Sequence, residues 1–309
     1  MTALRPEIQE LLRKKAELGL PGPGEAPAEV LRRNGLPDYA TTGPGENVAS
    51  VQDIFIPGPT AYIPVRIVTP VNKTSDSAMV FFHGGGWVLS NVDNYDVVLR
   101  SLANRTGAIV IAPNYQKAPE HKFPIPFDDC YETVKWAIAH AEKLGIDPRK
   151  VGVAGDSAGG NLSAAVALKN RDDGSYPLAY QILVYPCCDD SFETDSGNTY
   201  AEGFGLTKRG MEYFVAEYVT TADRHNPYAF PMHAKTLEGV APAVVITSEY
   251  DVLRDDGAKY AAKLRGDNVS VQHIHYDDAH HGAFMIAGIS DITNAMHDEI
   301  ASVIKLLTQ

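Results

Sequence analysis

Residues 155–159, Gly-Asp-Ser-Ala-Gly, constrain the fold of this chain more than any other stretch. They follow an apolar run, 151–154, which predicts a buried strand, and precede residues 160–170, whose Ala and Leu content predicts a helix. A serine between two glycines at such a turn is typical of a nucleophile elbow, because larger flanking side chains would clash with the backbone. The sequence therefore predicts a strand–turn–helix unit with the Ser157 hydroxyl raised at the sheet edge.

A second glycine-rich motif follows another predicted strand. The apolar run 79–82 leads into His83, which is followed by three glycines. Consecutive glycines let the backbone approach a substrate with its amides pointing inward, as an oxyanion-binding loop requires. We expect the amides of Gly84, Gly85 and Ala158 to donate to the oxyanion, and His83 to anchor the loop. No dinucleotide fingerprint or P-loop is present, which argues against a nucleotide-binding loop.

A serine nucleophile needs a base, and the base needs an orienting carboxylate. In hydrolases built on such sheets the acid and then the histidine follow the serine. Asp251 lies just past the predicted strand 243–248, at the edge where functional groups gather. Glu249 is a competitor, as are Asp255 and Asp256, although these two are expected in the first turn of the next helix.

Two adjacent histidines, His280 and His281, are candidates for the base. Both lie in the loop after the predicted strand 269–276. His273 and His275 share one face of that strand, so the four histidines together suggest a metal cluster. No recognised ligand spacing appears, however, and we expect no metal.

These motifs together resemble the hormone-sensitive-lipase-like esterases of the α/β-hydrolase superfamily. The resemblance covers most of the chain and rests on residues 83–87, 115–124, 127–131, 145–148, 155–162 and 250–255. It implies an α/β-hydrolase fold, a mainly parallel central sheet flanked by helices with a helical cap. It also implies a serine hydrolase that cleaves short-to-medium acyl carboxylic esters through Ser157, His281 and Asp251, with no cofactor.

The resemblance also bears on the choice of base. His281 is favoured because it directly precedes a glycine, as the base often does in this family. The family often has His-Gly-Phe there, whereas this chain has His-Gly-Ala-Phe at 281–284, so His280 stays open. A second departure from the family pattern lies at Gln116 and Lys117, where the family more commonly has Arg-Leu. The same triad serves amidases, formamidases and lactonases, and a non-catalytic ligand receptor is a further alternative on this scaffold.

The stretch 189–222 breaks the strand–helix alternation. It is polar at first and then predicts a helix over 207–218. We expect an N-terminal cap segment 1–45, a first core part 46–188, a cap insertion 189–222 and a second core part 223–309. An ordinary surface helix is the alternative. The residues expected to line a substrate pocket are Trp87, Asp156, Phe204, Leu206, Met211, Tyr213 and Phe214.

Other segments complete the predicted core. We expect a hairpin from 53–56 and 63–68, and strands at 108–112 and 180–184. A short amphipathic helix near the N-terminus is predicted from Ile8, Leu11, Leu12 and Leu18, and a C-terminal helical face from Ile292, Met296, Ile300, Val303 and Leu307.

Composition excludes some classes of partner. The net charge of −12 over 309 residues argues against nucleic acid, which needs a basic patch. No signal peptide and no membrane-spanning apolar run are evident. The three cysteines form no C-x-x-C, so free buried thiols in a reducing cytoplasm are expected. Relatives in the family are often dimers, which makes a homodimer one expected assembly.

Overall fold

The computed structural model describes residues 2–35 and 38–308. Its centre is an eight-stranded sheet of order β1-β2-β4-β3-β5-β6-β7-β8, in which β2 runs antiparallel to β1 and β4 and all other neighbours are parallel. The strands are β1 (Ser50–Pro57), β2 (Tyr62–Thr69), β3 (Ala78–Phe82), β4 (Ile109–Pro113), β5 (Val151–Asp156), β6 (Gln181–Val184), β7 (Ala243–Tyr250) and β8 (Val271–His280).

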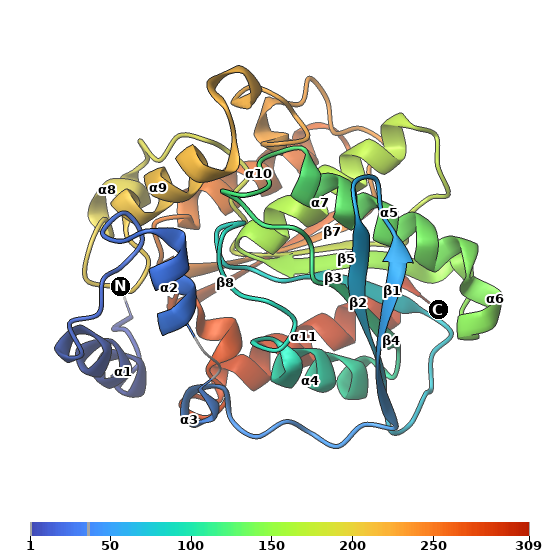
Figure 1. The fold of residues 1–309 in the computed structure, drawn as a ribbon, viewed down its shortest axis with the longest axis horizontal. Helices are drawn as coiled ribbons and strands as arrows, with labels where there is room; N and C mark the ends of the chain where they lie inside the picture. The colour runs from blue at the N-terminus through green and yellow to red at the C-terminus, as the bar shows by residue number, and fades with distance from the viewer. Residues whose placement is uncertain (1, 36–37, 309) are drawn as a thin grey trace.

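Helices cover both faces of this sheet (Figure 1). One layer holds α5 (Ile125–Ala139), α7 (Ala158–Asp172) and α10 (Arg254–Gly266), and the other holds α4 (Asp96–Thr106) and α11 (Ile292–Leu307). The central strands β3, β4, β5 and β6 are buried along their whole length. Their nearly continuous apolar runs are what a parallel sheet covered on both faces requires, and the predicted α/β architecture is confirmed.

The remaining helices lie mostly beyond the ends of the strands. In Figure 1, α1 (Pro6–Glu17), α2 (Ala28–Asn34), α8 (Asp195–Thr199) and α9 (Lys208–Tyr218) gather on the left of the molecule. Arg209 of α9 donates to the carbonyl of Gly24 at 2.7 Å, which ties the N-terminal segment to the segment between β6 and β7. Short elements complete the chain: α3 (Tyr39–Thr42), α6 (Ala141–Leu144), η1 (Pro148–Lys150), η2 (Thr221–Asp223), η3 (Pro231–His233) and η4 (Ala283–Met285).

Most predicted elements are confirmed, with small differences at their ends. The hairpin is β1–β2, and the predicted helix 207–218 is α9, whose N-terminus is capped by the Thr207 side chain. Helix α8 was not predicted. Leu18 is a correction, because α1 ends at Glu17 and the Leu18 side chain is 68% exposed.

Two further findings concern chemistry and environment. Cys130, Cys187 and Cys188 are buried and free, as predicted. Among the described residues, no helix combines the length and the apolar character needed to cross a bilayer.

Candidate active site

Three side chains from three different strand ends meet at one edge of the sheet. The Oγ of Ser157 lies 3.0 Å from Nε2 of His281, and Nδ1 of His281 lies 2.8 Å from Oδ2 of Asp251. Ser157 follows β5, Asp251 follows β7 and His281 follows β8, so carboxyl ends of parallel strands carry all three. In this geometry the imidazole can accept the serine proton while the carboxylate holds its other nitrogen.

The turn that carries Ser157 depends on its two glycines. Ser157 has φ of 56°, in a region that non-glycine residues rarely occupy. A Cβ on Gly155 would lie 2.4 Å from the Gly159 carbonyl oxygen, and a Cβ on Gly159 would lie 1.9 Å from the Phe82 carbonyl oxygen. The serine amide donates to the Val184 carbonyl at 2.8 Å, which fixes the strained residue to β6. The sequence-based elbow is therefore present in the structure.

Only one of the two adjacent histidines reaches the serine. Strand β8 continues to His280, four residues beyond the predicted end at 276, and pairs His280 with Tyr250 after a register shift. His280 is 4% exposed, and burial lowers its pKa to about 3. The geometry thus brings His281, and not His280, to the nucleophile.

The glycine loop after β3 requires a correction. The amide of Gly84 donates to the Tyr95 hydroxyl at 2.9 Å and to Oδ1 of Asp156 at 3.0 Å. An amide engaged by two buried acceptors is not directed at a substrate oxygen, so the expectation that Gly84 donates to the oxyanion is wrong. Among the described residues, no hydrogen bond is found for the amides of Gly85 and Gly86, which follow it.

Asp156 is the hub beneath this loop. Its carboxyl accepts from Gly84 and from Tyr95, whose hydroxyl is 2.9 Å from Oδ2, and it lies 3.4 Å from the Tyr185 hydroxyl. Burial raises the pKa of Asp156 to about 6, with the Tyr95 hydrogen bond acting in the opposite direction. Because Asp156 is only 3% exposed and fully engaged, its predicted place in the substrate pocket is wrong.

The loop has a second anchor in His83. Its Nδ1 is 2.8 Å from the carbonyl oxygen of Gly84, and its ring stacks on Tyr115 at 4.2 Å. Burial lowers the pKa of His83 to about 3, so the ring is neutral at neutral pH. The predicted anchoring role is consistent with these contacts.

The other predicted pocket residues divide into three groups. Trp87 and Met211 are 0% and 1% exposed and lie in the packed core. Trp87 stacks on Tyr218 and donates to Asn161, so its pocket assignment is wrong, whereas that of Met211 stays a prediction. Phe214 lies over the glycine loop, since a Cβ on Gly86 would be 2.3 Å from its ring. The remaining residues, Phe204, Leu206 and Tyr213, are partly buried.

Phe204 also lines a cavity of about 470 Å³ between α1 and the acid strand. Its other lining residues include Leu4, Leu12, Gly203 and Tyr250, the residue before Asp251. This cavity lies beside the acid loop and is not lined by Ser157 itself. A smaller cavity of about 190 Å³ lies between α3, α4 and α11.

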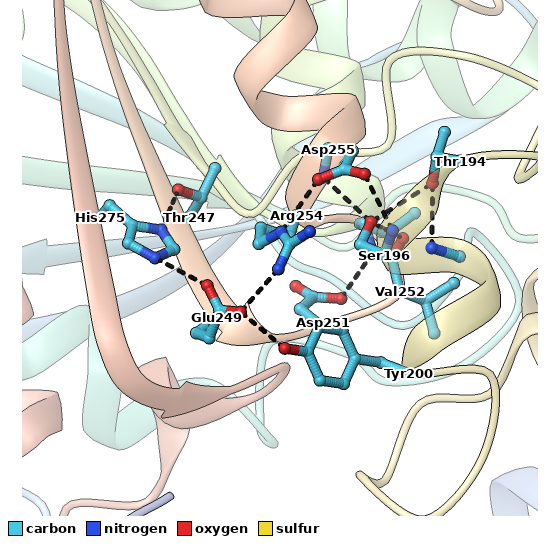
Figure 2. A network of polar contacts seen from close by, with 12 residues as sticks. Thr194, Ser196, Tyr200, Thr247, Glu249, Asp251, Val252, Arg254, Asp255 and His275 are labelled. Carbon is cyan, nitrogen blue, oxygen red and sulfur yellow. Dashed lines mark hydrogen bonds and ion pairs between the residues drawn. The ribbon is translucent and has the colours of Figure 1, made fainter. Parts of the chain in front are cut away.

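A network of ion pairs flanks the acid (Figure 2). Glu249 accepts from the Tyr200 hydroxyl and from Arg254, both at 2.6 Å, and lies 3.1 Å from Nε2 of His275. His275 and His273 both contact the Thr247 hydroxyl. Glu249, a competitor for the acid role, is thus engaged elsewhere, and the four histidines named in the sequence do not converge on one point.

A second branch of Figure 2 holds the loop that carries Asp251. The Ser196 hydroxyl of α8 donates to the Val252 carbonyl at 3.0 Å and accepts from the Asp255 amide at 3.1 Å. The Asp255 carboxylate accepts from the Ser196 amide at 2.8 Å. The carboxyl of Asp251 itself accepts from the Leu253 amide through Oδ1. No sequence signal marked Ser196, because its role depends on α8 packing against α10.

Comparison with known proteins is consistent with this geometry. A model of the α/β hydrolase fold matches residues 79–285. The carboxylic ester hydrolase LipN of Mycobacterium tuberculosis is 33% identical over 98% of this chain and 82% of its own length. The arylesterase of Saccharolobus solfataricus is 36% identical over 72% of each chain, and the arylacetamide deacetylase of Bos taurus is 33% identical over 71% of this chain and 72% of its own length.

Solved structures of ester-hydrolysing enzymes are similar to this chain over nearly its whole length. A hyperthermophilic esterase from Pyrobaculum calidifontis superposes with a TM-score of 0.93 at 35% identity, covering 99% of each chain. An ester hydrolase from the Lake Arreo metagenome gives 0.90 at 33% identity over 97% of this chain and 98% of the other.

Proposed function

Since the chain belongs to the hormone-sensitive-lipase-like carboxylesterase family of the α/β-hydrolase superfamily, we propose that it uses Ser157, His281 and Asp251 to cleave short-to-medium acyl carboxylic esters. The chain is an ester-hydrolysing enzyme, as its relatives are. The observation that carries the residue assignment is the pair of hydrogen bonds linking serine to imidazole and imidazole to carboxylate, at 3.0 and 2.8 Å.

Each member of the triad has a defined step. As the Ser157 oxygen attacks the ester carbonyl, its proton passes to Nε2 of His281, and the carboxylate of Asp251 stabilises the imidazolium. The tetrahedral intermediate collapses to an acyl-enzyme, and His281 gives the proton to the departing alcohol. A water molecule, deprotonated by His281, then attacks the acyl-enzyme and releases the acid.

The proposed oxyanion donors are the amides of Gly85, Gly86 and Ala158. Gly86 replaces Gly84 in this assignment, because the Gly84 amide is held by Tyr95 and Asp156. Ala158 is the first residue of α7, where an amide has no acceptor within the helix. Each such donor typically contributes about 3 kcal/mol to transition-state stabilisation.

The proposed substrate pocket lies under the segments 1–45 and 189–222, which we propose as a cap on core parts 46–188 and 223–309. What supports this is the contact of Arg209 with Gly24, and the position of Phe214 over the glycine loop. Phe204 and Leu206 remain proposed lining residues, and both are partly buried.

The first test replaces Ser157 with alanine. Hydrolysis of p-nitrophenyl acetate is expected to fall by about 10⁶-fold, as when a serine-protease nucleophile is removed. Labelling by a fluorophosphonate probe should also be lost. The matched control is Ser163→Ala, six residues further on and within α7, where the hydroxyl donates to the Gly159 carbonyl. Turnover retained by Ser157→Ala would contradict the assignment, and a p-nitrophenyl ester series would define the acyl limit.

An amide substrate is a second candidate. The name of one relative, arylacetamide deacetylase, supports testing an amide as well as an ester. Comparing kcat/KM for an aryl acetate and the matching aryl acetamide decides between the two, and a formamide and a lactone extend the same series.

Three expectations from the sequence are retained as proposals: a homodimer, a cytoplasmic location and the absence of nucleic-acid binding. Sedimentation velocity, cell fractionation and a gel-shift assay test them respectively.

A further inference from the structure

Two histidines and an aspartate outside the triad converge in the segment between β6 and β7. Asp190, His225 and His233 each offer one ligand atom, and these atoms lie within 4.8 Å of one another. Nε2 of His233 is 3.0 Å from Oδ1 of Asp190, and the two imidazole rings meet edge to face with centroids 4.9 Å apart. We infer that these three side chains form a binding site for a divalent transition-metal ion, with zinc as the favoured ion.

The donor set indicates which ion. Imidazole nitrogens with one carboxylate oxygen suit zinc, whereas calcium and magnesium favour sites made of oxygen ligands alone. Zinc bonds of this kind place neighbouring ligand atoms about 3.4 Å apart in a tetrahedron. The ligand atoms of Asp190 and His233 are 3.0 Å apart, near that value, and all three ligand atoms lie within 4.8 Å of one another.

The backbone beneath the site is already fixed. The Met232 amide, next to His233, donates to the Cys188 carbonyl at 2.9 Å, and the Cys188 amide donates to Oδ2 of the buried Asp256 at 2.7 Å. Two of the three ligands therefore sit on segments that are pinned together and to α10. Such a site needs little rearrangement to accept an ion.

The guanidinium of Arg224 does not occupy the proposed metal position. Arg224 lies 3.6 Å from Oδ2 of Asp190, whereas Oδ1 of the same carboxylate faces His233. The guanidinium and the metal would therefore use different oxygens. Asp189, with Oδ1 3.7 Å from Nε2 of His233, adds negative charge that favours a bound cation.

The position of the site assigns it a structural role. It would join residue 190 to residues 225–233, the two ends of the segment that contains α8 and α9. An ion here would close that loop and stabilise the segment without touching the reacting atoms.

The test begins with protein stripped by a chelator. Calorimetric titration with Zn²⁺ should give one tight site per chain. Co²⁺ should produce the visible absorption of a tetrahedral complex. Zinc at a concentration a hundredfold above its Kd should raise Tm by about 5 °C. His225→Ala and Asp190→Asn should each weaken zinc binding by about 100-fold. His225 is exposed, so its loss should leave the fold and the esterase activity unchanged.

Two control variants separate this site from other histidines. His121→Ala, on a different segment, and His281→Ala, in the triad, should each keep the zinc affinity within about twofold. The proposal is overturned if the unaltered protein binds no zinc, if His225→Ala binds it as tightly as before, or if His281→Ala removes the binding.

Discussion

The two sides of the catalytic hydrogen-bond chain are held in place by different kinds of interaction. On the serine side, the backbone passes so close to itself that Gly155 and Gly159 admit no side chain, and one buried carboxyl, Asp156, fixes the glycine loop. On the acid side, Arg254 of α10 and His275 of β8 form partly exposed ion pairs with Glu249 of β7, which also accepts from the Tyr200 hydroxyl.

This difference predicts which side of the site tolerates amino-acid substitution. A clash between backbone atoms or an altered buried carboxyl cannot be relieved by solvent, so single changes on the serine side should be costly. Ion pairs open to water are screened, and each contributes little alone. Three substitutions test the contrast, and they are taken in order of expected effect.

The largest effect is expected for Gly159→Ala. The new Cβ would lie 1.9 Å from the Phe82 carbonyl oxygen, and Phe82 cannot move away without disturbing its pairing with Gly155 of β5. We expect a loss of about 3 kcal/mol or more in the free energy of unfolding, measured by urea titration, together with loss of esterase activity. Gly266→Ala is the control, because a Cβ there meets no described atom within 4 Å. Equal stability of the two variants would remove the proposed distinction.

An intermediate effect is expected for Asp156→Asn, and it should depend on pH. The pKa of this carboxyl is raised by burial from 3.8 to about 6, so the folded protein holds a proton that the unfolded chain releases. Its contribution to stability is present below about pH 4 and is lost as pH rises to about 6. This shift in pKa corresponds to roughly 3 kcal/mol in the free energy of unfolding.

Asp156→Asn removes this titration, so its deficit in the free energy of unfolding relative to the unaltered protein should be largest below about pH 4 and should shrink as pH rises to about 6, as measured by urea unfolding at each pH. The buried histidines act with the opposite sign, because the pKa values of His280 and His297 are lowered to about 3 by burial. Their effect is common to both proteins and cancels in the difference. A difference that stays constant with pH would contradict the assigned pKa.

The smallest effect is expected for Glu249→Gln. It removes a charge shared by Arg254 and His275, beside the loop that carries Asp251. We expect kcat/KM to fall by about fivefold, since a partly exposed ion pair contributes about 1 kcal/mol. Glu132→Gln, which breaks an ion pair with Lys135 on α5, should leave kcat/KM unchanged. A loss as large as that of the serine-side variants would show that both sides are equally rigid.

The sequence alone predicted those parts of the site that depend on local chemistry. The elbow at Ser157 is marked by glycines that its backbone needs, and Asp251 follows a strongly apolar strand. The choice of His281 rested on resemblance, because the register shift that lengthens β8 as far as His280 arises from pairing with β7.

Contacts between segments far apart in the chain could not be predicted from the sequence. The engagement of Gly84 depends on Tyr95 and Asp156, which lie 11 and 72 residues away in the chain. Likewise, Trp87 was expected in a pocket, but it is covered by Tyr218 from α9. A motif indicates which residue types are present, and only the packed fold decides which of their donors stay available.

The order of strands in the sheet has a consequence for how activity returns after denaturation. The nucleophile and its base are 124 residues apart, and the base follows β8, which is both the last strand of the chain and an edge of the sheet. Such distant pairings close late in folding, because the entropy of the intervening loop must be lost first. Regained turnover should therefore lag behind regained circular dichroism and report the docking of that final strand.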